Sequence, residues 1–394
     1  MLSDRTMELA EAVTTAVLGV DALWQHMLKA EPTDAISDRL VVLNMSRAHV
    51  PDVFVTPADA RDRLTDLQAQ TRDLPEPDRR LYYDQFCGST IAFTHWLEGN
   101  LPFEWQLPAF LHVPAERVSD ARIDALKTEL RNTLNRLGYT GDLSAQAAAW
   151  EARHRVPPDE VAGVLAELMD EAWDRTNRVI EIPADKSDGM RPIAETGVPY
   201  NARCDYEQRE VALNIDPILT RPALKHLAVH ECYPGHYLQF KLGEVWYASG
   251  DAPADLLLSV VNTASSCTFE GIADVGMHMI DWIEGDDDRL QSLLTRYRSA
   301  IGTRAAWRLH AEGWSAEAVR DELARDALIG GDGWIDNRMG FISAPDRSAL
   351  IWSYWWGEEL VLPAWQAVAP ERRPDFYRFL FGRKHSPQSI AMFE

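Results

Sequence analysis

The sequence contains few cysteines, and their spacing excludes two classes of site. Four cysteines occur in 394 residues, and no two of them form a CxxC pair. A disulfide framework is typical of a shorter chain that is richer in cysteine, and a cysteine-based structural zinc site needs closely spaced pairs. We therefore expect the cysteines to be reduced and buried.

Long apolar runs and a basic leader are also lacking. Charged residues interrupt the longest apolar stretches well before the roughly 20 residues that a membrane-spanning helix needs. The N-terminus carries an early acidic residue, Asp4, and no basic segment followed by an apolar core, so it does not resemble a secretory signal. The sequence therefore predicts a cytoplasmic protein with no membrane partner.

Positive charge is scarce relative to negative charge. Lysine and arginine total 39 and aspartate and glutamate total 61, which gives a formal net charge of -22. Such a field repels phosphate backbones, and no basic stripe with interleaved aromatic residues is present, so nucleic acid is not an expected partner. The content of 46% hydrophobic and 25% charged residues is typical of a globular protein with one large domain or two lobes.

Helical periodicity dominates the first half of the chain. In residues 121–137, leucines recur at three- and four-residue spacing, which predicts a helix there. We expect a mainly α, two-lobed fold with a small sheet or hairpin. Residues 1–185 are predicted to form an N-terminal helical lobe and residues 186–394 a second lobe, within one integrated domain.

Two short segments in the middle of the chain have strand-like patterns. Residues 179–182 and 210–215 are rich in β-branched and aliphatic residues, and the second has a period of two, with Val211, Leu213 and Ile215 on one side. The second strand is either an edge that can take an extended peptide or part of a structural hairpin. Helices are predicted after it at residues 222–243, 255–284, 290–309, 316–328 and 349–369.

The most informative segment contains an adjacent His230-Glu231 pair followed by His236. In the common H-E-x-x-H arrangement, four-residue spacing puts both imidazoles on one helix face. Six residues of ideal helix rotate by about 600°, which leaves the two side chains roughly 120° apart. A regular helix could not direct both histidines at one metal ion.

Pro234 and Gly235 provide a means of distorting this helix. Proline removes a backbone donor and crowds the preceding turn, and glycine tolerates unusual backbone angles. A local bulge near Pro234 would realign His236 with His230. The alternative is a helix with a proline kink in which both histidines have ordinary polar partners.

The run H-E-x-x-P-G-H-x-L-Q, beginning at His230, resembles the domain of unknown function 885 family, which is similar to the gluzincin metallopeptidases. Later segments resemble the same family in order, namely Phe269-Glu-Gly-Ile-Ala273, Ala306-Trp-Arg-Leu-His310, Asn337-Arg-Met-Gly-Phe341 and Tyr354-Trp-Trp-Gly357. The resemblance covers the chain from about residue 180 onward. Tyr237 stands where many members carry a further histidine, and Met339 stands where they carry a tyrosine.

The resemblance implies a zincin-like fold with the small sheet at the wall of the cleft, and a zinc site in the second lobe, residues 186–394, which is then the catalytic lobe. It also implies that Glu270 is the third metal ligand, beside His230 and His236. Two imidazoles and one carboxylate leave a fourth zinc position for water, whose pKa falls towards about 7 in such a site. Glu231 would then act as the general base, although a surface glutamate that pairs with a lysine is the alternative. Asp274 would either orient a zinc-binding histidine or pair locally.

The family pattern also suggests roles for residues farther along the chain. His310 and Tyr354 would stabilise the negatively charged oxygen of a tetrahedral intermediate, although a tyrosine in such an apolar segment also suits core packing. Arg338 would bind a substrate carboxylate, as a carboxypeptidase or dipeptidase requires. Arg347 could do the same, or it could form a surface ion pair.

These residues predict a zinc-dependent hydrolase that cleaves an amide or peptide bond of a small peptide or metabolite. Two other classes stay open. One is a metal-dependent enzyme of another reaction type, such as a lyase, that uses the same ligands. The other is a non-catalytic metal-binding scaffold, which would be expected to lose the base that Glu231 provides.

Overall fold

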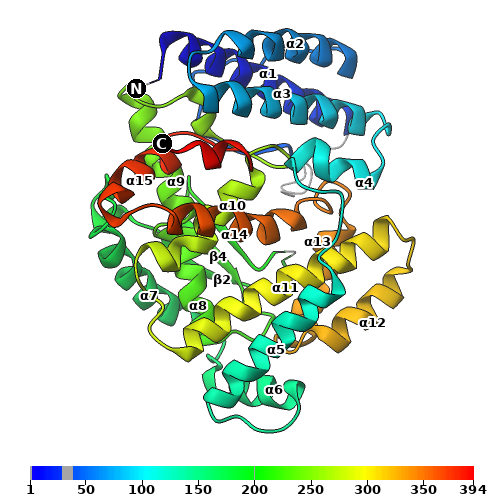
Figure 1. The fold of residues 1–394 in the computed structure, drawn as a ribbon, viewed down its shortest axis with the longest axis vertical. Helices are drawn as coiled ribbons and strands as arrows, with labels where there is room; N and C mark the ends of the chain where they lie inside the picture. The colour runs from blue at the N-terminus through cyan, green and yellow to red at the C-terminus, as the bar shows by residue number, and fades with distance from the viewer. Residues whose placement is uncertain (1, 29–38, 199) are drawn as a thin grey trace. The chain divides into compact units, whose positions relative to one another are not determined.

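Residues 2–28, 39–198 and 200–394 are described by the structure, a computed structural model in which helices dominate (Figure 1). The prediction of a mainly α fold with a small sheet is confirmed. Contacts divide the chain into two units, each with residues from both sides of position 185. Unit 1 consists of Met1–Ala115, Gln239–Ile272 and Trp356–Glu394, and unit 2 consists of Glu116–Leu238 and Ala273–Trp355.

Unit 1 begins with a layer of three helices that lie side by side, α1 (Asp4–Leu28), α2 (Pro57–Gln70) and α3 (Pro77–Leu97) (Figure 1). Apolar residues of α1 recur every three or four positions and are buried, as an amphipathic helix in a layer requires. The strands β1 (Val41–Asn44) and β5 (Leu258–Val260) pair antiparallel in this unit. Its other elements are η2 (Thr71–Asp73), α4 (Phe103–Gln106), η3 (Leu107–Leu111), η6 (Ala254–Leu257), η7 (Pro370–Arg372), α15 (Arg373–Phe381) and η8 (Ser389–Met392).

In unit 2, α11 (Asp286–His310) packs against four other helices, α5 (Asp120–Arg136), α8 (Arg221–Leu227), α12 (Ala316–Asp326) and α13 (Gly331–Ser343). The helices predicted at residues 121–137, 290–309 and 316–328 are confirmed as α5, α11 and α12. The further helices of this unit are α6 (Leu143–His154), α7 (Val161–Thr176), η4 (Lys186–Asp188) and η5 (Ala228–Cys232).

Three helices contain a boundary between the units, α9 (His236–Ala248), α10 (Ser266–Met279) and α14 (Ile351–Gln366). Helix α14 confirms the helix predicted at residues 349–369. Within the residues that the structure describes, no helix combines the length and the apolar character needed to cross a membrane. All four cysteines are free thiols, and three of them are buried while Cys204 is partly exposed.

The sheet of unit 2 has the strand order β2 (Arg191–Glu195), β4 (Glu210–Asn214), β3 (Ala202–Asp205). The strand predicted at residues 210–215 is confirmed as β4, but the suggestion that it is a free edge is wrong. It pairs parallel with β2 on one side and antiparallel with β3 on the other. Since both rows of backbone groups are already used, β4 cannot take a peptide as an added strand.

Two local predictions are wrong for identifiable reasons. Residues 179–182 do not form a strand, because the amides of Val179 and Ile180 both donate to the carbonyl of Thr176 and continue the end of α7 as a turn. The single helix predicted over residues 255–284 is interrupted by β5. That strand pairs with β1, which lies more than 200 residues earlier, and no local pattern reveals such a partner.

Candidate metal centre

The segment that carries the paired His230-Glu231 is a helix that is interrupted after these two residues. Thr220 caps α8 by accepting a hydrogen bond from the amide of Ala223, and the helix then widens into the π-turn η5, on which both residues lie. Tyr233 follows with extended backbone angles, and a new helix, α9, starts at His236. The distortion predicted near Pro234 is therefore confirmed, and the π-turn adds a second departure from regular geometry.

Gly235 is required by the close return of the chain at this point. Its amide donates to the carbonyl of Val229 over 3.0 Å. A Cβ at Gly235 would lie 1.8 Å from the carbonyl oxygen of His230, which is far inside contact distance. Only glycine permits this approach, so the residue that suggested distortion in the sequence is also the one that permits it.

The interruption brings the two histidines together. The ring centroids of His230 and His236 lie 4.7 Å apart with the planes at 81°, and both residues are buried. A regular helix would direct them to different faces. Closeness of the two rings is what a shared metal ion requires, and it is equally compatible with a proline kink in which both histidines have ordinary polar partners.

Asp274, on α10, anchors the first of these histidines. His230 Nδ1 donates to Asp274 Oδ1 over 2.8 Å, and His226 Nε2 lies 3.4 Å from the same oxygen. Burial raises the pKa of the Asp274 carboxyl, but the charge of His230 and the hydrogen bonds from both histidines outweigh burial and hold the pKa well below its usual range. Of the two roles considered for Asp274, orientation of a histidine is the one that this contact supports.

His226 is a residue of this site that sequence reasoning missed. It precedes His230 by four residues, and in the helical part of the segment that spacing places two imidazoles on one face. Their ring centroids are 5.7 Å apart. The four-residue spacing of the two histidines is the signal in the sequence that points to His226.

One group of side chains within unit 2 has the composition of a metal site. It contains His226, His230 and Asp274, whose potential ligand atoms lie within 4.8 Å of one another. Of the predicted ligands, His236 also belongs to unit 2, and Glu270 belongs to unit 1. Glu270 precedes Asp274 by one turn on α10, so that one helix supplies both carboxylates. A histidine that donates through Nδ1 to a carboxylate keeps the Nε2 lone pair for a metal, which is the usual state of a histidine ligand.

A cavity of about 230 Å³ opens beside this cluster in unit 2. Glu231, Arg338 and Tyr354, which the sequence assigned to catalysis and substrate binding, all line it. Its walls come from η5 and α8, from α11 and from α13. Its lining also includes His226, His230, Asp274, Arg298, Trp334, Asn337 and Phe341.

His310 and Arg347 occupy other positions. His310 is the last residue of α11 and is not among the described residues that line the cavity, and its Nε2 donates to the carbonyl of Ile342 over 2.6 Å. Arg347 is buried, with Nη1 at 3.4 Å from Asp346 Oδ2, so the alternative of an exposed surface ion pair does not describe it. Neither residue gains support for a role at the cavity.

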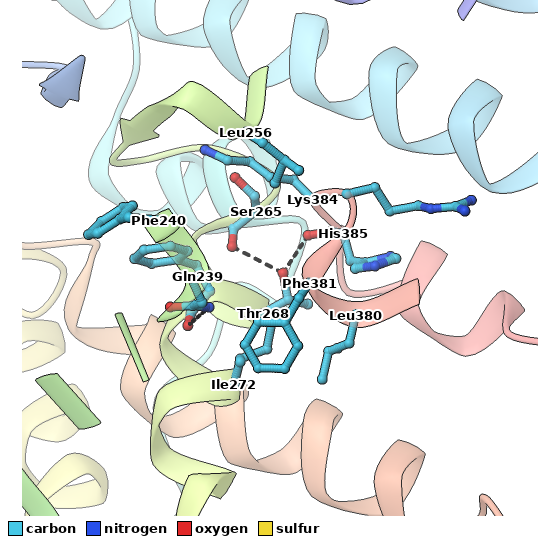
Figure 2. A pocket seen from close by; sticks show the side chains of 12 residues that line it. Gln239, Phe240, Leu256, Ser265, Thr268, Ile272, Leu380, Phe381, Lys384 and His385 are labelled. Atoms are coloured by element: carbon cyan, nitrogen blue, oxygen red, sulfur yellow. Dashed lines mark hydrogen bonds between the residues drawn. The ribbon is translucent and has the colours of Figure 1, made fainter. Parts of the chain in front are cut away.

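Unit 1 contains a second, much smaller cavity of about 20 Å³ (Figure 2). Figure 2 shows the hydroxyl of Thr268 bonded to the carbonyls of Ser265 and His385. Lys384 donates to the carbonyl of Leu258, and His385 Nε2 donates to that of Phe379. The space is sufficient for about one water molecule, and its lining includes His385, whose Nδ1 has no hydrogen-bond partner among the described residues, so we assign this cavity no ligand larger than water.

Comparison with known proteins identifies the fold and leaves the function open. No family model matches the chain, and no curated protein matches it. Among solved structures, a candidate lipoprotein from Colwellia psychrerythraea aligns with a TM-score of 0.56 at 12% identity, over 96% of this chain and 74% of that one. A candidate lipoprotein of unknown function from Shewanella oneidensis aligns with a TM-score of 0.51 at 14% identity, over 88% and 74% of the two chains. These likenesses concern the fold alone.

Proposed function

We propose that this protein is a zinc-dependent hydrolase that cleaves an amide or peptide bond in a small peptide or metabolite. The observation that carries the proposal is the contact between Asp274 and His230, with His236 against the same ring. Carboxylate-oriented histidines are a common feature of zinc sites, and His230, the histidine that Asp274 orients, lines the cavity.

The donor set fits zinc in its chemistry. His230, His236 and Glu270 would hold the ion through two imidazole nitrogens and one carboxylate, the combination that leaves room for water and substrate. When bound, zinc supplies a Lewis acid that polarises a carbonyl group and acidifies water. Asp274 would keep the His230 ring in the orientation and tautomer that binding requires.

Glu231 is the residue proposed to move the proton. It is buried, it lines the cavity, and it follows His230 directly on the π-turn. A carboxylate in this position can accept a proton from the attacking water and return it to the leaving amine. Tyr354 lines the same cavity, and its hydroxyl is the proposed donor to the oxygen that becomes negative during attack.

The test combines metal analysis with a screen of blocked and free peptides. We expect about one zinc per chain after purification without chelators. Glu231→Gln should keep the zinc and lower turnover by about 10²- to 10⁴-fold, because it removes the base and preserves the shape. Glu181→Gln, at an exposed position in unit 2, makes the same change away from the cavity and should leave turnover unchanged.

Two results would reject the proposal, namely the absence of a bound transition metal and full activity in Glu231→Gln. Metal binding without hydrolysis of any peptide or amide would favour the lyase or scaffold alternatives. The cytoplasmic location expected from the sequence also stays a prediction, since the two solved structures described above are named as candidate lipoproteins. Fractionation of cells that express the protein tests it.

A further inference from the structure

Helix α13 carries two buried nitrogen donors without a hydrogen-bond partner among the described residues, on side chains that line the main cavity. Arg338 Nε and Asn337 Nδ2 are buried, and neither has a hydrogen-bond partner in the part of the chain that the structure describes. Both residues line the cavity, and Asn337 is only 9% exposed. Buried donors of this kind cost free energy unless a ligand or water satisfies them.

Arg338 differs from the other arginine at this cavity. Arg298 donates to the carbonyl of Ile329, and the negative charge of Glu151 favours its charged form. Among the described residues, Arg338 forms no ion pair with a carboxylate, and its guanidinium contacts the ring of Trp334 at 5.4 Å. Burial lowers the pKa of Arg338 to about 10, and Tyr354 opposes that shift.

The chemistry of these donors selects the kind of ligand. A guanidinium without a carboxylate partner requires an anion, and the planar fork of arginine matches the two oxygens of a carboxylate. The Asn337 amide adds a third donor from the same helix. Trp334 and Phe341 line the same cavity and offer apolar contacts beside the anion.

We propose that α13 forms a carboxylate subsite, in which Arg338 and Asn337 bind the free carboxylate of a small substrate. This substrate class rests on the proposed hydrolase function, because Glu231 lines the same cavity and the bond to be cleaved would lie near it. The enzyme then acts on acyl amino acids or on the C-terminal bond of short peptides. Substrates whose carboxylate is blocked bind poorly.

Binding measurements test the subsite without requiring turnover. N-acetyl-L-phenylalanine and N-acetyl-L-phenylalaninamide differ in charge at one end alone, and inorganic phosphate serves as a second anion. Calorimetric titration of the Glu231→Gln protein, both as purified and after treatment with a chelator, separates binding at α13 from binding to zinc. We expect the acid to bind about 10- to 100-fold more tightly than the amide in both preparations.

Three variants assign that preference to particular residues. Arg338→Gln should reduce it to within about twofold, because a neutral amide cannot replace the fork. Asn337→Asp should weaken binding of the acid about tenfold or more and leave binding of the amide unchanged, because it replaces a hydrogen-bond donor with a negative charge. Arg320→Gln is the matched control, because Arg320 is exposed, pairs with Asp336 and should retain the full preference.

Each of the other outcomes overturns the proposal. These are equal binding of acid and amide, a preference that survives Arg338→Gln, tighter binding of phosphate than of the acid, and no binding of any probe at millimolar concentrations. If Arg338→Gln does not fold, the response of Asn337→Asp decides between the same outcomes. A preference that depends on Arg338 in a protein without hydrolase activity would support the subsite and reject the proposed function.

Discussion

Removal of the Asp274 charge is the most direct perturbation of the proposed metal centre. Asp274→Asn keeps the size of the side chain and can still accept one hydrogen bond, but it loses the charge that fixes His230 Nδ1 as a donor. The carboxylate lies 2.8 Å from that nitrogen and is 8% exposed, so little solvent screens the interaction. Loss of such an orienting carboxylate typically weakens metal binding about 10- to 100-fold, which corresponds to about 1.4 to 2.7 kcal/mol.

Competition with a chromophoric zinc chelator measures this loss directly. Asp281→Asn provides the control, because Asp281 is exposed just after α10 and the substitution removes the same charge. Circular dichroism and thermal melting of the chelated proteins establish that both variants fold. If Asp274→Asn binds zinc as tightly as the native protein, Asp274 does not orient a ligand and the reasoning from this contact fails.

Three further perturbations have defined outcomes. His236→Ala should reduce bound zinc from about one ion per chain to a small fraction in elemental analysis, since two ligands hold zinc poorly, and retention of stoichiometric metal would remove His236 from the site. Gly330→Ala should lower the free energy of unfolding by about 1 to 3 kcal/mol, and by more than Gly331→Ala does. Both glycines have positive φ, but a Cβ at Gly330 would also lie 2.5 Å from Arg298 Nη2. Equal losses of stability in urea unfolding would show that this close contact has no cost. Burial raises the pKa of the Asp78 carboxyl, but the two arginine partners of Asp78 outweigh burial and hold this pKa below its usual value. The contribution of Asp78 to the free energy of unfolding is therefore present above about pH 4 and is lost as pH falls through the depressed pKa. Asp78→Asn should weaken this loss of stability in acid, and urea unfolding curves that shift equally between pH 6 and pH 3 in both proteins would refute the prediction.

The sequence by itself determined the features that depend on neighbouring residues. The leucine spacing in residues 121–137 predicted α5 to within one residue at each end, because helix formation follows a local period. The six-residue separation of His230 and His236 excluded a regular helix, and Pro234-Gly235 showed where it would break. Both inferences used the backbone geometry of one continuous segment, and for that reason they held.

Only the tertiary structure decided which distant segments meet. β4 has the pattern of a half-exposed strand, yet its neighbours β2 and β3 cover both of its edges. The pairing of Asp274 with two histidines more than 40 residues earlier, and the convergence of α13 on the cavity that Glu231 lines, depend on how helices pack. Packing brings together surfaces from separate parts of the chain, and the local sequence of each part does not specify its partner, which is why the contact of Asp274 with His226 and the placement of Asn337 and Arg338 at the same cavity as Glu231 became visible only in three dimensions.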